Sequence, residues 1–189
     1  MKRISRENGQ DGLTLVELMV AVAILSILLS LGAPSLGGML SKYRMRTAAH
    51  RLVAAMNLAR IEAVSRNTPV TLCPVADSVL GSCGTDYAFG WRLFSNEDRD
   101  EVLDEGSDQL IHLFPALPQG FSITNRLGTR VVADAVTWYP DGTARRNLSF
   151  QLCAPNSHGA SAYSVVLNLV GRARVARVTR YLRSLSPGG

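Results

Sequence analysis

Two arginines near the C-terminus are spaced to bind phosphate groups. They lie in the tetrapeptide Gly171-Arg172-Ala173-Arg174. In an extended segment Arg172 and Arg174 project to the same side, about 7 Å apart, which is close to the spacing of successive phosphates on a nucleic acid strand. A guanidinium group binds phosphate oxygens bidentately, a geometry that lysine does not offer. Three more arginines follow, at Arg177, Arg180 and Arg183.

The charge distribution favours an anionic partner at the C-terminal end. The chain of 189 residues has a formal charge of +5, and segment 171–189 holds five arginines and no acidic residue. Phosphate contacts carry no base information, so such binding would be independent of sequence and sensitive to salt. A second interpretation is structural, with the glycine at a strand bend and the arginines on a solvated face.

An acidic segment precedes this region and raises the question of a calcium site. Between residues 97 and 108 seven acidic residues stand against one base, Arg99. Calcium takes oxygen ligands at alternate positions, but the segment lacks a glycine at the sixth position and a glutamate at the twelfth. We therefore expect a solvated loop or a surface for a basic neighbour, and no metal site.

The cysteines are Cys73, Cys83 and Cys153. Their odd number and the lack of a CxxC pair exclude the common zinc spacings and a thioredoxin-like motif. Outside the cytoplasm, one disulfide and one spare thiol is the simplest arrangement. We favour Cys73–Cys83, which closes a short loop, and keep Cys73–Cys153 as the alternative.

The sequence holds no catalytic triad, metal set or phosphate loop, so we expect neither an enzyme nor a cofactor.

The N-terminus contains an apolar run from Leu13 to Leu31 with a carboxylate inside it, Glu17. Nineteen helical residues cover roughly 28 Å, enough for a bilayer core. A buried charge without a partner costs several kcal/mol, so Glu17 requires an explanation. Basic residues in the leader indicate a cytoplasmic N-terminus. A secretory signal peptide would have a shorter apolar core followed by a cleavage site.

Helical periodicity continues beyond this run. Leu52, Met56, Ala59 and Ala63 recur at three- and four-residue steps, which predicts an amphipathic helix to about Arg66. Asn67 and Pro69 end it, and Pro34 with its neighbouring glycines marks a weak or bent region.

After Pro69 the sequence turns to short β-rich runs separated by turn residues. A long helix followed by antiparallel strands predicts an α+β fold, with the helix covering the sheets. The expected strands are 70–75, 89–95, 109–116, 121–126, 135–141, 148–154, 163–171 and 173–180.

The N-terminal segment GLTLVELMVAVAILSILLSLGAPS resembles the start of type IV pilins and type II secretion pseudopilins. The resemblance implies that a prepilin peptidase cuts between Gly12 and Leu13 and that the new Leu13 amine is methylated, although the family usually has phenylalanine there. Glu17 and Pro34 fall where the family keeps a glutamate and a helix-kinking proline. The cleaved amine of a neighbouring subunit would then be the partner of Glu17.

The remaining chain is similar to the GspH/FimT family of minor pilins and pseudopilins. The similarity rests on YAFGWRLFS with its acidic loop, on VTWYPDGTAR, on FQLC and on VVLNLVGRAR. It implies a type IV pilin fold. In FimT-type minor pilins linked to DNA uptake a Gly-Arg-x-Arg motif contacts DNA, which implies a DNA-binding set here of Gly171, Arg172, Arg174, Arg177, Arg180 and Arg183.

These observations predict four segments: a leader over 1–12, a transmembrane helix over 13–34, its amphipathic continuation over 35–68, and a β-rich head over 69–189. The expected protein is a minor pilin of a type IV pilus that binds DNA and supports natural transformation and pilus assembly. The alternative is a structural pseudopilin of a type II secretion system. Expected partners are other major and minor pilins, the prepilin peptidase, the inner membrane and DNA. The head would lie in the periplasm and later in the filament at the cell surface.

Overall fold

A computed structural model describes residues 14–76, 78, 80–155 and 163–177, with no account of the side chains of 29–37 and 177. The chain divides into two compact units, Met1–Leu40 and Ser41–Gly189. Helix α1, Leu15–Arg66, contributes residues to both units. Its backbone is helical through Pro34. Among the residues that the structure describes, no helix combines the length and the apolar character needed to cross a membrane.

Helix α1 ends where the sequence predicts. Asn67 adopts a left-handed conformation with φ 53°, which asparagine tolerates better than most residues. The N–H of Thr68 then donates to the carbonyl of Ala63 at 3.3 Å, the long-range bond of a Schellman cap. Pro69 follows and cannot continue the helix.

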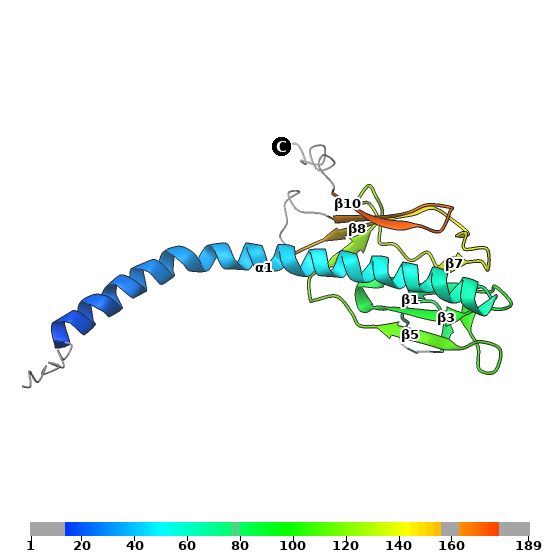
Figure 1. Ribbon diagram of the computed structural model, residues 1–189, viewed down its shortest axis with the longest axis horizontal. Coiled ribbons are helices and arrows are strands. Elements are labelled where there is room, and N and C mark those ends of the chain that lie inside the picture. Colours follow the sequence, from blue (N-terminus) through cyan, green and yellow to red (C-terminus); the bar gives the residue numbers. More distant parts are fainter. Residues whose placement is uncertain (1–13, 77, 79, 156–162, 178–189) are drawn as a thin grey trace, which may run out of the picture. The chain divides into compact units, whose positions relative to one another are not determined.

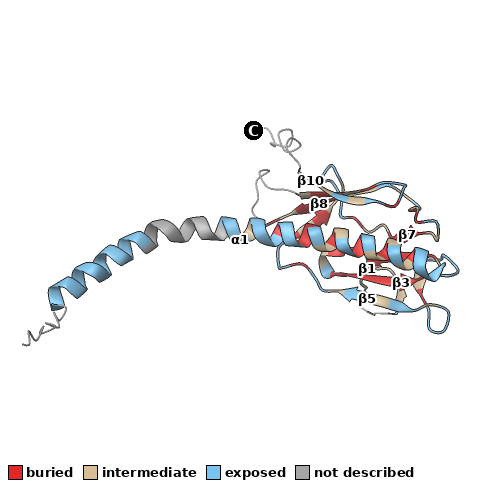
Figure 2. Ribbon diagram, in the orientation of Figure 1, coloured by how far each residue is buried: buried red, intermediate tan, exposed pale blue. Residues whose placement is uncertain are grey.

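In the second unit, one face of α1 is buried in the main hydrophobic core. The predicted stripe of Leu52, Met56, Ala59 and Ala63 is fully buried. Met45, Ala48, Ala49 and Ala55 extend this face. The opposite side of the helix is exposed, as Figure 2 shows by its colouring. The amphipathic pattern is therefore explained by one-sided packing against strands.

In the described part of the chain, the strands form two four-stranded antiparallel sheets and a short two-stranded ribbon (Figure 1). The first sheet has the order β5-β3-β1-β7 and the second the order β10-β9-β8-β6, while β2 pairs with β4. The strands are β1 Val70–Pro74, β2 Gly81–Ser82, β3 Trp91–Ser95, β4 Val102–Leu103, β5 Leu110–Phe114, β6 Ser122–Thr124, β7 Val136–Trp138, β8 Leu148–Cys153, β9 Tyr163–Leu167 and β10 Ala173–Arg177.

All eight predicted strands are present, each within its expected range. The two-residue strands β2 and β4 and a 3-10 turn, Tyr87–Phe89, were not predicted. The inner faces of both sheets and the helix share one apolar cluster, whose largest members include Trp91, Trp138 and Phe150. The predicted α+β fold, a helix packed on antiparallel sheets, is confirmed.

A disulfide joins Cys73 to Cys83, the first of the two pairings considered. Cys73 is buried on β1, the strand between β3 and β7. The two cysteines are ten residues apart in the sequence, so the bridge closes a short loop. Cys153 is a free thiol, half-buried, and burial raises its pKa. The ten-residue loop is therefore tied to the centre of the first sheet.

Candidate nucleic-acid interface

The turn between β9 and β10 places the Gly-Arg-x-Arg sequence. The N–H of Gly171 donates to the carbonyl of Asn168 at 3.0 Å, and the N–H of Asn168 donates to the carbonyl of Arg172 at 3.2 Å. The Asn168 side chain adds a third bond, accepting the N–H of Arg172 at 2.9 Å. The carbonyl of Leu169 accepts the N–H of Ala144. These bonds fix the backbone from which the arginines project.

Gly171 is required at this turn for two reasons. Its φ of +77° lies in the left-handed region, where a Cβ is disfavoured. A Cβ at this position would also overlap the carbonyl oxygen of Gly142. The carbonyl of Gly171 in turn accepts a hydrogen bond from the buried Trp138 Nε1 at 3.1 Å. The glycine of the motif thus joins the β9–β10 turn to the Asp-Gly turn after β7.

The Asp-Gly turn is itself well ordered by hydrogen bonds. Asp141 Oδ1 accepts the hydroxyl of Thr143 at 2.7 Å and its N–H at 2.8 Å. These two bonds, that of the hydroxyl first, hold the pKa of Asp141 below its usual value. From the helix, Arg60 Nε donates to the carbonyl of Gly142 at 3.0 Å. The Asp-Gly turn, on which Gly171 packs, is therefore held by its own Asp141–Thr143 bonds and by Arg60 of α1.

Arg172 and Arg174 are both exposed, with Arg174 on β10, the last strand of the second sheet. Ala173 and Val175 alternate with them and pack against the core. Alternation along the strand therefore directs the arginines away from the core. Within the residues that the structure describes, neither Arg172 nor Arg174 takes part in an ion pair. Their guanidinium groups are available to an external anion.

The other predicted arginines are placed only in part. Arg177 ends β10 in register with Tyr163, and its side chain is outside the described residues. Arg180 and Arg183 lie wholly outside them. The structure thus places Arg172 immediately before β10 and Arg174 on it, and the DNA-binding role of all five arginines stays a prediction.

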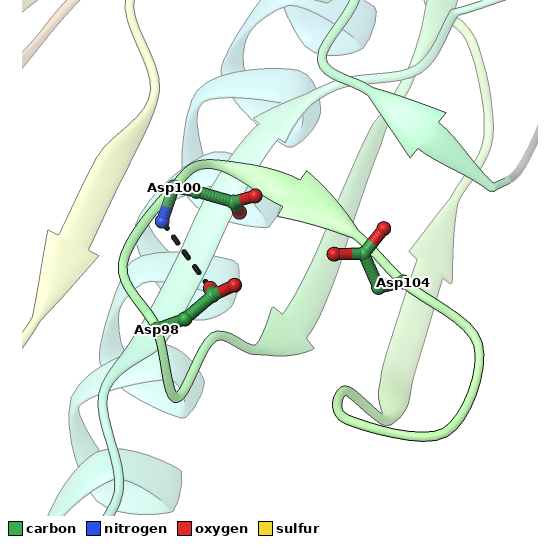
Figure 3. Close-up of side chains that lie close together, drawn as sticks. All are labelled: Asp98, Asp100 and Asp104. Atoms are coloured by element: carbon green, nitrogen blue, oxygen red, sulfur yellow. Dashed lines mark hydrogen bonds between the residues drawn. The ribbon is translucent and has the colours of Figure 1, made fainter.

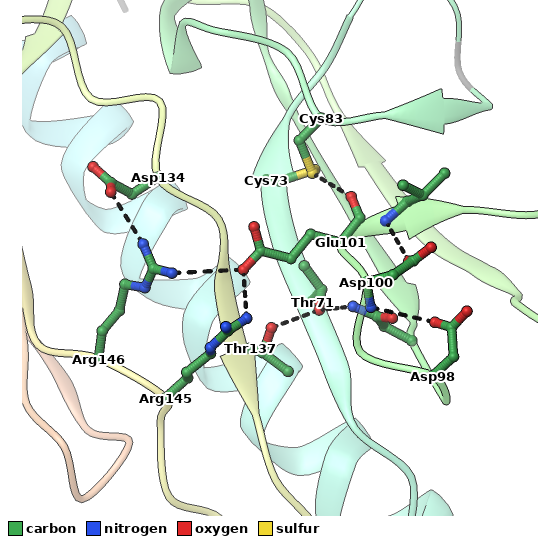
Figure 4. A network of polar contacts seen from close by, with 12 residues as sticks. Thr71, Cys73, Cys83, Asp98, Asp100, Glu101, Asp134, Thr137, Arg145 and Arg146 are labelled. Carbon is green, nitrogen blue, oxygen red and sulfur yellow. Dashed lines mark hydrogen bonds and ion pairs between the residues drawn. A yellow bond between two sulfur atoms is a disulfide. The ribbon is translucent and has the colours of Figure 1, made fainter.

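Two further arginines, Arg145 and Arg146, lie close to the same turn but are occupied. Arg145 binds Glu101 at 2.8 Å, and Arg146 binds Asp134 at 3.0 Å (Figure 4). Glu101 also lies 3.6 Å from Arg146 and so links the two ion pairs. This network joins the loop before β8 to the acidic loop and to the segment before β7. The charges of Arg145 and Arg146 are therefore compensated inside the protein.

The acidic loop brings three carboxylates together. The side chains of Asp98, Asp100 and Asp104 lie within 4.8 Å of one another and are exposed (Figure 3). Two of them support the loop backbone, since Asp98 accepts the N–H of Asp100 and Asp100 accepts the N–H of Val102. Their oxygens are of the type that a divalent cation takes, but exposed acidic groups commonly gather without an ion.

The N-terminal motif shows a feature that sequence reasoning missed. Thr14 precedes the first residue of α1, and its Oγ1 accepts the N–H of Glu17 at 3.2 Å. Thr14-x-x-Glu17 has the spacing of a capping box, in which a threonine and a glutamate satisfy the first N–H groups of a helix. Glu17 is exposed on the single chain. Gly12 and Leu13 lie outside the described residues, as does the side chain of Pro34.

Comparison with protein families gives two matches. A family described as type II transport protein GspH matches residues 48–171. A prokaryotic N-terminal methylation motif matches residues 8–33. The first covers most of the second unit and includes the turn at Gly171, and the second covers the apolar run with Glu17. No curated protein matches the chain.

Two solved structures are similar to this chain, and the first of them shows the same fold. The crystal structure of the type IV minor pilin FimU from Pseudomonas aeruginosa (strain PAO1) is 16% identical, with a TM-score of 0.54 over 70% of this chain and 87% of that chain. The minor pseudopilin EpsH from the type 2 secretion system of Vibrio cholerae is 11% identical, with a TM-score of 0.49 over 72% of this chain and 99% of that chain. The chain therefore belongs to the GspH family, described as type II transport proteins, and carries a prokaryotic N-terminal methylation motif.

Proposed function

We propose that this chain is a minor pilin of a type IV pilus that binds DNA without sequence specificity through Arg172 and Arg174, supporting DNA uptake in natural transformation as well as pilus assembly. One observation carries the proposal: these two arginines are exposed and unpaired among the described residues, whereas the neighbouring Arg145 and Arg146 are held in ion pairs. The role is one of binding and assembly, without catalysis.

The proposal also assigns the processing and location of the chain. Residues 1–12 are a leader that a prepilin peptidase removes between Gly12 and Leu13, and residues 13–34 anchor the mature chain in the inner membrane. Residues 35–68 continue the helix, and 69–189 form the head in the periplasm. Assembly with other major and minor pilins then carries the head to the cell surface. The methylation motif over residues 8–33 supports this division.

Replacement of both arginines by alanine tests the DNA contact directly. The full-length chain in detergent is titrated with a 30-base-pair duplex at several salt concentrations, by fluorescence anisotropy. If the wild type neutralises three to five phosphates, its log K falls with log salt with a slope of roughly −3 to −5. For Arg172→Ala/Arg174→Ala we expect a slope smaller by about two and an affinity at least about tenfold lower at low salt.

Two further variants separate geometry from charge. Arg172→Lys/Arg174→Lys keeps the charge and loses the bidentate geometry, so it should fall between the wild type and the alanine variant. Arg44→Ala/Arg46→Ala removes two exposed arginines from α1 and should bind almost like the wild type. Equal affinities of the wild type and Arg172→Ala/Arg174→Ala would refute the assigned contact.

A pseudopilin of a type II secretion system is the second candidate, and the family description as a type II transport protein favours it. In that role the chain is structural and has no need of DNA. The same titration decides between the two candidates, because a wild-type chain that fails to bind duplex DNA even at low salt leaves the pseudopilin role as the better one.

Glu17 allows a separate test of filament assembly. If its carboxylate pairs with the N-terminal amine of a neighbouring subunit in an apolar environment, Glu17→Ala should be processed normally but incorporated at least about tenfold less, because a charge of the pair is left uncompensated. Incorporation is measured as the fraction of the chain in sheared filaments, and processing as the mass of the N-terminal peptide.

Glu17→Gln distinguishes charge pairing from helix capping. Glutamine keeps the Thr-x-x-Gln form of a capping box and loses the charge. If pairing with the amine is the main role, Glu17→Gln should fail like Glu17→Ala. Normal incorporation of the glutamine variant would show that the residue acts in capping and would contradict the pairing.

A further inference from the structure

The tip of the β9–β10 turn carries two exposed aliphatic side chains next to the proposed DNA contact. Leu169 is 55% exposed and Val170 is 58% exposed. Among the described residues, neither is part of a buried apolar cluster. Val170 stands two residues before Arg172, so their Cα atoms are at most about 7 Å apart. The apolar tip and the first arginine of the motif are therefore close enough to contact the same partner.

The backbone of this tip is fixed by hydrogen bonds. Three of them close the turn between Asn168 and Arg172. The carbonyl of Leu169 also accepts the N–H of Ala144 at 3.0 Å, which ties the tip to the chain just after the Asp-Gly turn. Ordering a loop on binding costs free energy, and a rigid loop has lost that freedom already on folding. Leu169 and Val170 are thus presented to a partner without this cost.

The charges around the tip favour an anionic partner. No aspartate or glutamate follows Asp141 in the sequence, and Arg172 and Arg174 are both exposed beside the tip. A partner that suits this surface has negative charges next to an apolar interior. DNA has this chemistry, because its phosphates flank a stack of bases into which some proteins insert apolar side chains.

Two other partners suit the tip less well. An anionic membrane also has phosphates above an apolar layer, but membrane binding scales with the buried apolar area, and two aliphatic side chains offer little. A stable protein interface buries about 800 Å² on each partner around a core that is depleted of charged residues, whereas this tip is narrow and adjoins arginines. Insertion into a base step needs only one side chain, and leucine is among the residues that DNA-bending proteins use for it.

We propose that Leu169 is a wedge that enters a base step of the DNA bound by Arg172 and Arg174, with Val170 packed against the sugar beside that step. The inference rests on the proposed function and adds to it a contact with the base stack. The wedge makes no hydrogen bond to a base, so binding stays independent of sequence apart from a preference for steps that unstack easily.

Serine substitutions at the tip should weaken binding without changing its salt dependence. Apolar contacts release no counterions, so Leu169→Ser/Val170→Ser in the full-length chain should bind the duplex about fivefold to tenfold less tightly, with the salt slope of the wild type. Arg172→Ala/Arg174→Ala, by contrast, lowers both the affinity and the slope.

The matched control is Leu127→Ser/Val131→Ser. It also removes one exposed leucine and one exposed valine. Both residues follow β6, which lies at the opposite end of the sheet order from β10. This variant should bind DNA within about twofold of the wild type, because exposed side chains away from the contact have little effect. Circular dichroism melting verifies that each variant is folded.

A fluorescent base reports the insertion itself. The probe is the same duplex with one central mismatch and 2-aminopurine beside it, since a mismatched step unstacks at lower cost. The wild type should bind this probe about threefold to fivefold more tightly than the matched duplex, and the fluorescence of the unstacked 2-aminopurine should rise. Leu169→Ser/Val170→Ser should lose both effects. Leu169→Met/Val170→Ile keeps an apolar tip and should retain them.

The outcomes separate the wedge from the proposed function. If Arg172→Ala/Arg174→Ala weakens binding and the serine variant of the tip does not, the wedge is wrong and the proposed function stands, with the tip left to a lipid surface or a neighbouring protein. If the serine variant binds less tightly but keeps the mismatch preference and the fluorescence rise, insertion is also refuted. A wild-type chain that binds no duplex even at low salt overturns both. The wedge holds if affinity, mismatch preference and fluorescence rise are lost together in the serine variant alone.

Discussion

Gly171→Ala is expected to lower the free energy of unfolding of the head by about 3–5 kcal/mol. Two costs combine. A non-glycine residue at φ +77° is strained, and its Cβ would overlap the Gly142 carbonyl, which is backbone and cannot rotate away. The displacement would also weaken the hydrogen bond from Trp138 Nε1 to the carbonyl of Gly171.

Urea denaturation followed by tryptophan fluorescence measures this effect, because Trp91 and Trp138 are both fully buried. Gly128→Ala is the matched control. Gly128 has a similar φ of +71° but open space where its Cβ would lie, so its cost should stay near 1 kcal/mol. If Gly171→Ala and Gly128→Ala lose the same free energy of unfolding, the close approach of Gly171 to Gly142 does not contribute to the cost.

Removal of the Cys73–Cys83 bridge is the second change with a large expected effect. In the chain-entropy model, closing a loop of this length lowers the entropy of the unfolded chain and so raises the free energy of unfolding by about 3 kcal/mol. Cys73 is also buried against Phe94, Leu103 and Ala135, so alanine leaves unfilled space. We expect Cys73→Ala/Cys83→Ala to unfold at a clearly lower urea concentration than the oxidised wild type.

The control for the disulfide is Cys153→Ala, since this thiol is half-buried and takes no part in the bridge. It should cost less than about 1.5 kcal/mol. Thiol labelling with mass spectrometry of the wild type should modify Cys153 alone. Modification of Cys83 would indicate the alternative pairing and would contradict the expected loss.

Local patterns in the sequence were sufficient to predict helix α1 and eight of the strands. The end of α1 follows from Asn67 and Pro69, and the strands follow from alternating runs between turn residues. The stripe from Leu52 to Ala63 predicted the buried face of the helix because a helix on a sheet buries one side only. The alternation of Arg172 and Arg174 with Ala173 and Val175 is likewise consistent with the exposure of both arginines, while their joint role stays a prediction.

Such local patterns do not predict contacts between segments that are distant in the sequence. Gly171 was recognised as a glycine at a strand bend, but nothing local indicates that it packs on Gly142. The ion pairs of Arg145 and Arg146 depend on where Glu101 and Asp134 arrive in space. A surface pocket is lined by residues from segments 125–134, 147–149 and 166–167, and no local pattern predicts that these segments meet.

The position of β10 as the outermost strand of its sheet has an evolutionary consequence. Its outward residues touch one neighbouring strand only, so changing them disturbs little packing. A lineage could thus acquire or discard nucleic-acid affinity through a few codons of this strand while the scaffold persists. Relatives sharing this architecture would then be sorted by the chemistry of that outermost strand more readily than by overall similarity.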